Sequence, residues 1–334
     1  MSPKKIAING FGRIGRYLCR LLADSDEYVI ASINARATNE QLAHLLKYDS
    51  THGRFPYPVK AAEEGIEING RLVPVTRWAL GEWKWSELGI DLVVETTGKI
   101  KDKKGAEAHL ACGAKKVIVS APCKEADATI VMGVNESAYD PAAHRVISAA
   151  SCTTNCLAPA AYVLDKEFGI EHGLMTTIHS YTMSQRVLDG SDKDLRRARS
   201  CAVSMIPTST GAAKAIGLVM PQLKGKLDGM AIRVPTPDVS VVDFTCVLKR
   251  EVTAEEVNAA LKAASESYLK ENLGYTDEPL VSVDFIGSTY GGVVDSQLTS
   301  VMQGNFLKVI VWYDNEAGFT NQLCRLIKLV SASL

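Results

Sequence analysis

Short apolar runs alternate with amphipathic, helix-like segments through the first half of the chain. The apolar runs are rich in Val and Ile, which is typical of buried strands. We predict strands over residues 5–9, 29–34, 92–97, 116–120 and 145–149, and helices over 16–23, 39–46 and 103–112. Strands and helices that alternate in this way form a mostly parallel, doubly wound sheet, with ligands at the carboxyl ends of its strands.

The second half of the chain has longer strand-like runs with little helix between them. We predict strands over 173–179, 229–235, 240–249, 280–284 and 306–313, and helices over 254–270 and 317–330. This pattern indicates an α+β domain with an antiparallel or mixed sheet. The chain of 334 residues is long enough for two domains.

Composition and charge narrow the classes of protein. The apolar fraction of 46% is ordinary for a soluble globular protein, and 37 basic residues nearly balance 38 acidic ones. The chain therefore has no field of one sign that would attract nucleic acid or a membrane surface. Eight cysteines without a leading charged-then-apolar segment favour reduced thiols in the cytoplasm over a disulfide framework. No apolar run approaches the roughly 18 residues that span a bilayer, so we expect a soluble cytoplasmic protein with no nucleic-acid or membrane partner.

A glycine-rich turn follows the first predicted strand. Residues 5–9 run into Gly10, Gly12 and Gly15 in a G-x-G-x-x-G pattern, and a predicted helix comes next. In the dinucleotide-binding fingerprint the first glycine permits the tight turn, the second lets a pyrophosphate approach the backbone, and the third lets the helix pack against the strand. The alternative is a turn that is merely rich in glycine. The strand before it and the helix after it favour a Rossmann-type dinucleotide-binding domain.

Cys152 is the candidate nucleophile. It lies in the small polar stretch 150–156, after a predicted strand and where a helix is expected to begin. The N–H groups and the positive dipole end at a helix start stabilise a thiolate, which is the reactive form of cysteine. A buried, inert cysteine is the alternative. Its neighbours, Ser151 and the run 153–155, argue against that alternative, because they line a core poorly but are good donors to an anionic ligand.

The order of five motifs resembles one family in particular. The chain is similar to phosphorylating glyceraldehyde-3-phosphate dehydrogenase along essentially its whole length. The shared blocks are Asn9–Arg16, Leu45–Ser50, Ser151–Cys156, Thr208–Lys214 and Trp312–Glu316. The cysteine block followed by His179–Thr182 is highly specific, and no other family known to us combines these motifs in this order.

The resemblance implies a catalytic pair and two anion sites. Cys152 would attack D-glyceraldehyde 3-phosphate, and His179 would activate its thiol, form an ion pair with it and later take the hydroxyl proton of the thiohemiacetal. Hydride loss to the nicotinamide gives a thioester, which inorganic phosphate converts to 1,3-bisphosphoglycerate. The substrate phosphate would bind Thr182 and Arg233. The attacking phosphate would bind a second set of residues, namely Ser151, Thr153, Thr210 and Gly211, with Arg197 close by.

Several of these residues have a structural alternative. A lone histidine at the end of an apolar run is usually structural, and the arginines in 196–199 form a charge run that solvent or another subunit commonly covers. Residues 208–211 also suit a helix cap. The cap and the anion site are compatible interpretations, since a helix start is itself an anion site.

The resemblance also implies the contacts to the cofactor. Asn315 would hold the nicotinamide carboxamide and so fix the ring face. The full predicted set is Asn9, Gly10, Phe11, Gly12, Arg13, Ile14, Gly15, Asn34, Ala35, Arg36, Arg77, Thr97, Gly98, Ser120, Ser191 and Asn315. No metal site is predicted.

Three positions depart from the pattern that selects NAD. An acid at the end of the second strand normally binds the ribose 2′-hydroxyl of NAD, but here Ala35 stands at that position and Arg36 follows it. Loss of the acid removes repulsion of a 2′-phosphate, and Arg36 can attract one. Ser191 stands where NAD-selective relatives commonly have proline and NADP-using relatives often have serine. We predict that NADP is preferred over NAD or comparable to it; the alternative is that Arg36 faces solvent and NAD works well.

At other positions the sequence differs from many relatives, so the detailed cofactor contacts of the family are less securely carried over to this chain. Met183 and Ser184 stand where many relatives have asparagine and aspartate, Phe319 replaces a usual tyrosine, and Ile100 stands where an aromatic often flanks the adenine. Cys156, one helical turn past the nucleophile, suits packing better than an oxidative partnership.

The resemblance implies domains and assembly as well. We expect a dinucleotide-binding domain over 1–150, a catalytic domain over 151–316, and a C-terminal helix, 317–334, that packs back on the first domain. The family is a homotetramer in which the loop between His179 and Thr208 reaches a neighbour's cofactor, so a homotetramer is expected here.

Two other functions fit the same scaffold. An erythrose-4-phosphate dehydrogenase would share the thiol chemistry but usually alters the Thr-Ser-Thr-Gly segment, which is intact at 208–211. A noncatalytic binding protein would not need Cys152, His179, Thr182 and Arg233 together. An enzyme is therefore favoured.

Overall fold

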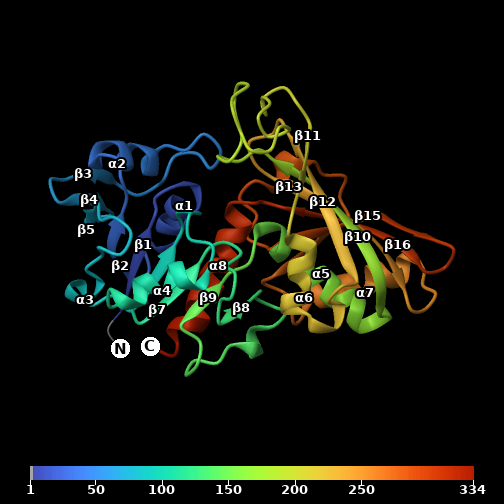
Figure 1. Cartoon of the computed structure of the whole chain (residues 1–334). Helices are drawn as coiled ribbons and strands as arrows, with labels where there is room; N and C mark the ends of the chain where they lie inside the picture. The colour runs from blue at the N-terminus through green and yellow to red at the C-terminus, as the bar shows by residue number, and fades with distance from the viewer. Residues whose placement is uncertain (1–2) are drawn as a thin grey trace. The chain divides into compact units, whose positions relative to one another are not determined.

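The chain folds into two compact units, each with its own sheet (Figure 1). The structure is a computed structural model that describes residues 3–334. The first unit contains the chain up to Ile130 together with Glu136–Ala150 and Leu323–Leu334. The second contains Val131–Asn135 and Ser151–Gln322.

The described residues of the first unit form a nine-stranded sheet with helices. Its elements are β1 (Lys4–Asn9), α1 (Arg13–Leu22), β2 (Tyr28–Asn34), α2 (Asn39–Lys47), β3 (Val59–Ala61), β4 (Gly65–Ile68), β5 (Arg71–Thr76), α3 (Trp85–Leu88), β6 (Leu92–Glu95), α4 (Lys103–Ala111), β7 (Lys116–Val119), β8 (Ala128–Thr129), the 3₁₀ turn η1 (Glu136–Ala138) and β9 (Val146–Ser148). The strand order is β3-β4-β5-β2-β1-β6-β7-β9-β8, and all pairs within the run β5-β2-β1-β6-β7-β9-β8 are parallel. The predicted doubly wound parallel sheet is therefore confirmed.

The middle of this sheet brings three polar residues together. β1 lies between β2 and β6, and the register places Asn9 beside Asn34 on one side and beside Glu95 on the other. β1 and β6 are buried on both faces, as parallel strands covered by helices are. At the carboxyl ends of these strands and of β2, buried polar side chains therefore lie together, next to the glycine turn that follows Asn9.

A small antiparallel edge, formed by β3, β4 and β5, was not predicted from the sequence. Asn69 and Gly70 both have positive φ, 50° and 78°, and they turn the chain between β4 and β5. Positive φ at both central residues is the geometry of the tight hairpin turn that an Asn-Gly pair favours. The strands beside this turn are short and partly exposed, so their hydrophobic alternation is weak.

The second unit is built on a seven-stranded mixed sheet among its described residues. Its elements are α5 (Cys152–Phe168), β10 (Ile170–Ser180), β11 (Ile206–Ser209), α6 (Ala212–Val219), the 3₁₀ turn η2 (Pro221–Leu223), β12 (Leu227–Val234), β13 (Ser240–Leu248), α7 (Ala254–Glu266), β14 (Leu273–Thr276), the 3₁₀ turn η3 (Ser282–Phe285), β15 (Gly292–Met302), β16 (Phe306–Tyr313) and α8 (Ala317–Ser331). The strand order is β11-β12-β10-β13-β16-β15-β14. β10 is parallel to β12 and antiparallel to β13, which confirms the predicted α+β unit with a mixed sheet.

The predicted strand at 280–284 is wrong. Residues 282–285 form the 3₁₀ turn η3 instead, because the Asp284 carboxylate accepts a hydrogen bond of 2.8 Å from the Val281 N–H and closes the turn. Strands β11, β14 and β15 were missed. In the outer half of β15, polar residues are mixed with exposed apolar ones, which weakens the alternation of a half-buried strand.

The last helix, α8, begins in the second unit, and its final residues belong to the first. There the hydroxyl of Ser331 lies 3.2 Å from the Tyr28 hydroxyl. Among residues 3–334, no helix combines the length and the apolar character that crossing a membrane would require.

Candidate active site

Cys152 is the first residue of α5, as predicted. Ser151 caps the helix, because its Oγ accepts a hydrogen bond of 3.0 Å from the Thr154 N–H. Ala150, just before the cap, has a φ of 58°, a left-handed conformation that is uncommon for a residue other than glycine. The chain turns sharply here, and the thiol side chain stands at the helix start, partly accessible to solvent.

His179 lies at the end of β10 and faces the thiol. Its Nε2 is 3.5 Å from Cys152 Sγ, a distance at which thiol and imidazole can exchange a proton. The imidazole is buried, with 4% of its surface exposed. The structure thus brings together the two residues that were predicted to form the catalytic pair.

The other ring nitrogen of His179 has two neighbours. Nδ1 lies 2.7 Å from the Ser180 carbonyl oxygen and 2.7 Å from Arg233 Nη1. A protonated Nδ1 donates to the carbonyl, whereas an unprotonated Nδ1 accepts from the guanidinium, so these two contacts select different tautomers. The tautomer that donates to Ser180 leaves a lone pair on Nε2, directed at the thiol.

Burial opposes charge on both members of the pair. Burial raises the pKa of the Cys152 thiol, while Arg233, the Thr153 hydroxyl and the N–H groups at the helix start act in the opposite direction without outweighing it. Burial and then the Arg233 guanidinium lower the pKa of His179 to about 3. Burial of both groups therefore opposes the predicted ion pair, whereas Arg233 and the helix start favour its thiolate; the ion pair stays a prediction.

Thr153 supports the nucleophile. Its side chain is buried, and its Oγ1 lies 2.8 Å from the Tyr313 hydroxyl, which is also 2.8 Å from Thr177 Oγ1. The same hydroxyl lowers the pKa of Cys152. The Thr153 hydroxyl is held by Tyr313 inside the unit, and its predicted contact to the attacking phosphate stays a prediction. Tyr313, at the end of β16, was not among the predicted site residues, because its contact with Thr153 depends on pairing of strands far apart in the chain.

Two guanidinium groups lie near the catalytic pair. Arg233 Nη1 donates to the Ser180 carbonyl at 2.9 Å, and Arg197 Nε donates to Thr208 Oγ1 at 2.7 Å. Burial lowers the pKa of Arg233, and the charge of Arg197 lowers it further. Two neighbouring cations that repel each other form a favourable place for a multiply charged oxyanion.

The hydroxyl residues predicted for the anion sites occupy turns and helix starts. Thr182 pairs with the Ser184 hydroxyl at 2.9 Å and Thr210 Oγ1 accepts from the Ala212 N–H at 3.2 Å. Gly211 is the residue before α6, and α6 begins at Ala212 as predicted. The cap and anion-site interpretations of residues 208–211 remain compatible here.

Asn315 is held by residues that the sequence did not point to. Its Oδ1 accepts a hydrogen bond of 2.7 Å from Ser240 Oγ, and Ser240 Oγ accepts one of 3.1 Å from the Ser180 N–H. The Ser180 hydroxyl in turn donates to the Val239 carbonyl at 2.6 Å. The backbone beside His179 and the side chain of Asn315 are therefore fixed by one buried network.

The predicted cofactor residues of the first unit surround a hollow of about 440 Å³ at the carboxyl ends of β1 and β2. The predicted residues that line it are Asn9, Gly10, Phe11, Gly12, Asn34, Ala35, Arg36, Arg77 and Thr97. Five other predicted residues of this unit do not line it, namely Arg13, Ile14, Gly15, Gly98 and Ser120. Ser191 and Asn315 belong to the second unit. Trp78, Leu80 and Trp83 also line the hollow and were missed.

The glycine turn fits a dinucleotide. Gly10 has a φ of 100°, and a Cβ there would lie 2.7 Å from the Thr97 nitrogen, so the tight turn requires glycine. A Cβ on Gly15 would lie 2.3 Å from the Gly10 carbonyl oxygen, so this glycine serves helix packing. A Cβ on Gly12 would meet nothing within 4 Å. The open space at Gly12, at the start of α1, is where a pyrophosphate can approach the backbone.

Arg13, a predicted cofactor contact, and the residues that depart from the family pattern have these surroundings in the structure. Arg13 forms a two-pronged ion pair with Asp49, with Nη2 to Oδ1 at 3.0 Å, and this pair holds the pKa of the carboxyl far below its usual range against the cost of burial. Ile100 is nearly buried and lines the hollow beside the tryptophans. Phe319 is buried, whereas Met183 is almost fully exposed.

Cys156 is buried in α5, and its thiol donates to the Val311 carbonyl at 3.6 Å. Burial raises its pKa well above the usual range, so the thiolate that oxidation requires is disfavoured. This arrangement favours the packing role over an oxidative one.

Comparisons with known proteins place both units. Residues 4–103 match the sequence model of the glyceraldehyde 3-phosphate dehydrogenase NAD binding domain, and residues 151–315 match that of the C-terminal domain. The chain is 53% identical over 329 residues to a glyceraldehyde-3-phosphate dehydrogenase of Geobacillus stearothermophilus, covering 98% of both chains. It is 53% identical to glyceraldehyde-3-phosphate dehydrogenase 1 of Bacillus cereus, covering 96% of this chain and 97% of that one, and 52% identical to glyceraldehyde-3-phosphate dehydrogenase 1 of Bacillus subtilis, covering 98% of both. With domain models matched in both halves and curated relatives aligned along nearly its full length, the chain belongs to the glyceraldehyde-3-phosphate dehydrogenase family and is an enzyme of that activity.

Proposed function

We propose that Cys152 and His179 carry out the phosphorylating oxidation of D-glyceraldehyde 3-phosphate to 1,3-bisphosphoglycerate. The observation that carries this assignment is the 3.5 Å contact between Cys152 Sγ and His179 Nε2 at a helix start. A neutral imidazole beside a thiol is a general base in its working form.

The first step forms a bond between Cys152 Sγ and the aldehyde carbon. The thiol proton passes to His179 Nε2 and from there to the former carbonyl oxygen, which gives a thiohemiacetal. The hydrogen bond from Nδ1–H to the Ser180 carbonyl holds the tautomer that this transfer requires. Because the thiol proton moves to His179 Nε2 as the C–S bond forms, no free thiolate has to form in the buried site before the attack.

Oxidation and phosphorylation then follow on the same sulfur. When bound, the nicotinamide supplies a hydride acceptor for the thiohemiacetal carbon. His179 Nε2 takes the hydroxyl proton as the carbon becomes a thioester carbonyl. An oxygen of inorganic phosphate attacks that carbonyl, the C–S bond breaks, and Cys152 leaves as a thiolate. Arg233, the Thr153 hydroxyl and the start of α5 stabilise this leaving thiolate.

The two phosphate groups bind around the guanidinium pair in this proposal. Arg233 and Thr182 receive the substrate phosphate. The attacking phosphate is received by Ser151, Thr153, Thr210 and Gly211, with Arg197 close by. The repulsion between Arg233 and Arg197 supports this assignment, because an oxyanion bound between them removes it.

A serine in place of Cys152 tests the assignment. Cys152→Ser is expected to lower kcat by at least about a thousandfold, because an alcohol is a far poorer nucleophile at neutral pH. Cofactor affinity, measured by quenching of tryptophan fluorescence, should stay unchanged. Cys112→Ser, which alters a half-buried cysteine on another helix end, is the matched control and should retain full activity. An active Cys152→Ser enzyme would disprove the proposal.

For the cofactor, we propose that NADP is used in preference to NAD or comparably. The match to an NAD binding domain supports use of NAD. Ala35 and Arg36 both line the hollow at the end of β2, and Arg36 is exposed. A ribose 2′-phosphate placed there meets a cation and no carboxylate, which supports binding of NADP.

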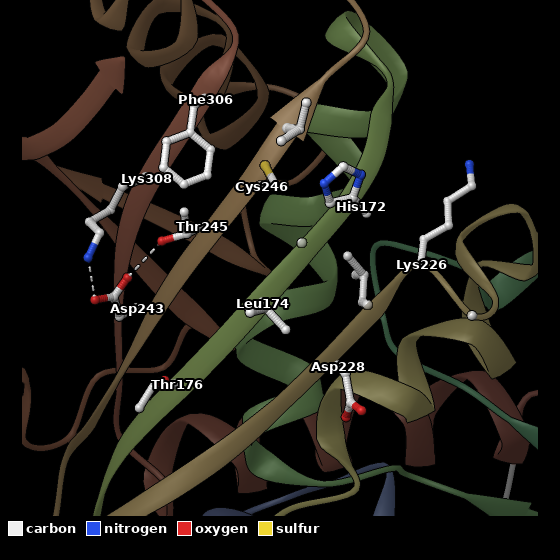
Figure 2. Close-up of a pocket in the computed structure, with 14 residues that line it drawn as sticks. His172, Leu174, Thr176, Lys226, Asp228, Asp243, Thr245, Cys246, Phe306 and Lys308 are labelled. Atoms are coloured by element: carbon white, nitrogen blue, oxygen red, sulfur yellow. Dashed lines mark hydrogen bonds and ion pairs between the residues drawn. The ribbon is translucent and has the colours of Figure 1, made fainter. Parts of the chain in front are cut away.

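We also propose a homotetramer, and two exposed apolar surfaces support it. The segment 183–205 carries six exposed apolar side chains, namely Met183, Val187, Leu188, Leu195, Val203 and Met205, each at least 69% exposed. The second surface is a groove of about 670 Å³ on the sheet face formed by β10, β12, β13 and β16 (Figure 2). Figure 2 shows Leu174, Thr176 and Phe306 on this groove beside the Asp243–Lys308 ion pair. Apolar surface of this extent marks an interface, and the occupant we propose is a second copy of the chain.

The remaining expectations stay proposals. We propose a dinucleotide-binding domain over 1–150, completed by the C-terminal helix, and a catalytic domain over 151–316. We propose a cytoplasmic location, which the eight reduced thiols support.

A further inference from the structure

A carboxylate is buried beneath the glycine turn of the first unit. Glu95, the last residue of β6, is 1% exposed. One carboxylate oxygen accepts hydrogen bonds from the Thr97 N–H, at 2.7 Å, and from the Thr97 hydroxyl. The other accepts from Asn9 Nδ2 and lies 3.2 Å from His109 Nε2. Both oxygens are therefore surrounded by donors, as a buried carboxylate requires.

The orientation of His109 follows from its other neighbour. His109 is fully buried in α4, and Trp85 Nε1 lies 3.1 Å from its Nδ1. An indole N–H can only donate, so Nδ1 must hold a lone pair and the ring proton must lie on Nε2, which then donates to Glu95. The Trp83 ring stacks on the imidazole with a centroid distance of 3.8 Å and keeps it in place.

The same chain of hydrogen bonds continues to the wall of the cofactor hollow. Asn9 donates to Glu95 and therefore turns its Oδ1 toward β2, where it accepts from Asn34 Nδ2 at 2.8 Å. Asn34 Oδ1 in turn accepts from the Trp78 N–H at 2.9 Å and the Thr76 hydroxyl at 3.0 Å. Glu95 can only accept, so its charge fixes which way both amides point.

We propose that Glu95 and His109 are a positioning pair that holds the adenosine side of the cofactor hollow, through Asn9 and Asn34, in the shape that binds the dinucleotide. Asn34 directly precedes Ala35, and Trp78 lines the hollow itself, so the pair reaches both sides of the adenosine wall. The pair touches neither reacting atoms nor the hollow, and it acts on affinity rather than on the chemical step. This inference rests on the cofactor placement proposed above.

The test is the isosteric variant Glu95→Gln. In either rotamer the new NH₂ group must face donors, because Thr97 donates to one side and Asn9 with His109 to the other. Relief requires the Asn9 amide to turn over, which breaks its bond to Asn34. We expect the Kd for NAD, NADP and ADP-ribose to rise about tenfold or more, read from quenching of tryptophan fluorescence, while kcat at saturating cofactor changes less than about twofold.

Two variants of His109 refine the test. His109→Gln keeps an N–H donor near the position of Nε2 and should retain most of the affinity, whereas His109→Leu removes the donor and should behave like Glu95→Gln. Tyr139→Phe is the control, because it removes a hydrogen bond to Lys116 in the same unit away from the hollow. It should leave every Kd unchanged.

The outcomes separate the inference from the placement on which it rests. Gly12→Val fills the open space at the turn and should abolish binding if the dinucleotide lies there. Unchanged affinity in Gly12→Val would refute the placement. Weakened affinity in Gly12→Val with normal affinity in Glu95→Gln would refute the positioning pair alone. The pair is also refuted if His109→Gln and His109→Leu are equally impaired, if Tyr139→Phe weakens binding as much, or if Glu95→Gln lowers kcat and leaves Kd unchanged. If Glu95→Gln does not fold, the two His109 variants decide the question.

Discussion

At the scale of single residues, Arg233 has opposite effects on the two catalytic groups. Its charge lowers the pKa of the Cys152 thiol, which favours the nucleophile, and it lowers the pKa of His179, which makes the imidazole a weaker base. In the proposed mechanism, a substrate phosphate bound to Arg233 would reduce the second effect, because it would partly neutralise the guanidinium. The imidazole would then be a better proton acceptor when substrate is present.

The proposed cofactor preference can also be tested at single residues. Ala35→Asp restores a carboxylate at the end of β2, where it repels a 2′-phosphate and accepts from a 2′-hydroxyl. We expect the ratio of kcat/KM for NADP to that for NAD to be one or higher in the wild-type enzyme and to fall about tenfold or more in Ala35→Asp. The measurement is the rate of reduced-nicotinamide absorbance with glyceraldehyde 3-phosphate and phosphate.

Two comparisons make the cofactor result specific. Arg36→Ala should lower the efficiency with NADP more than with NAD, whereas Arg71→Ala, an exposed arginine of the same unit outside the hollow, should change neither. A wild-type enzyme with a strong preference for NAD would show that the interpretation of Ala35, Arg36 and Ser191 is wrong, while the assignment of the reaction would stand.

At the scale of elements, the features that were predicted from the sequence are those that depend on residues close together in the chain. The glycine turn, the start of α5 at Cys152 and the start of α6 at Ala212 follow from short-range rules, because glycine geometry and helix capping involve neighbours in the chain. The register that sets Asn9 beside Glu95 and the path that brings Tyr313 to Thr153 depend on pairing between distant strands. These long-range contacts leave no local pattern, so the supporting residues of both sites could not be predicted.

The turn between β12 and β13 contains a buried carboxyl group, Asp238, next to a second one, Asp314. Asp238 is nearly buried in this turn, and a carboxylate oxygen lies within 4.8 Å of one of Asp314. Asp314 accepts three backbone hydrogen bonds, from the N–H groups of Gly287, Glu316 and Ala317 at 2.8, 2.8 and 2.6 Å. Burial, then the charges of Asp314 and Glu316, raise the pKa of Asp238 to about 8.

This turn predicts how stability depends on pH. Asp238 is protonated in the folded chain at pH 6 but ionised in the unfolded chain, so the folded state binds more protons between about pH 4 and pH 8. Its contribution to the free energy of unfolding is therefore present at low pH and is lost as pH rises toward 8. Asp238→Asn remains neutral, and we expect its stability relative to wild type to improve by about 1 kcal/mol per pH unit between pH 6 and 8.

Urea unfolding at several pH values measures this difference. Asp277→Asn removes an exposed carboxylate from the same unit and should keep a constant difference from wild type across the range. Parallel pH profiles for Asp238→Asn and wild type would show that Asp238 does not hold a proton in the folded protein. Because Val239, next in the turn, has a strained φ of 63° and bonds Ser180, unfolding of this turn should also loosen the backbone beside His179.

At the scale of the whole molecule, the chain divides its tasks between two units. The hollow proposed for the dinucleotide and the Glu95–His109 pair belong to the first unit, whereas Cys152, His179, Arg233 and Arg197 belong to the second. The apolar surfaces described above also belong to the second unit. A chain with a formal charge of −1 has little net charge repulsion to prevent association through such surfaces.

The proposed homotetramer is tested by mass in solution. We expect light scattering to give about four times the chain mass of 36.1 kDa for the wild-type protein. Leu195→Glu places a charge on the segment 183–205, where it would be buried against a neighbour at a large cost, so it should lower the measured mass. Leu174→Glu does the same on the groove of Figure 2 and should separate a different pair of subunits. Leu72→Glu, on an exposed apolar residue of β5, is the control and should leave the mass unchanged. If both charged variants keep the wild-type mass, these surfaces are not the interfaces, whereas loss of mass in only one of them would show that the other surface remains exposed in the assembly.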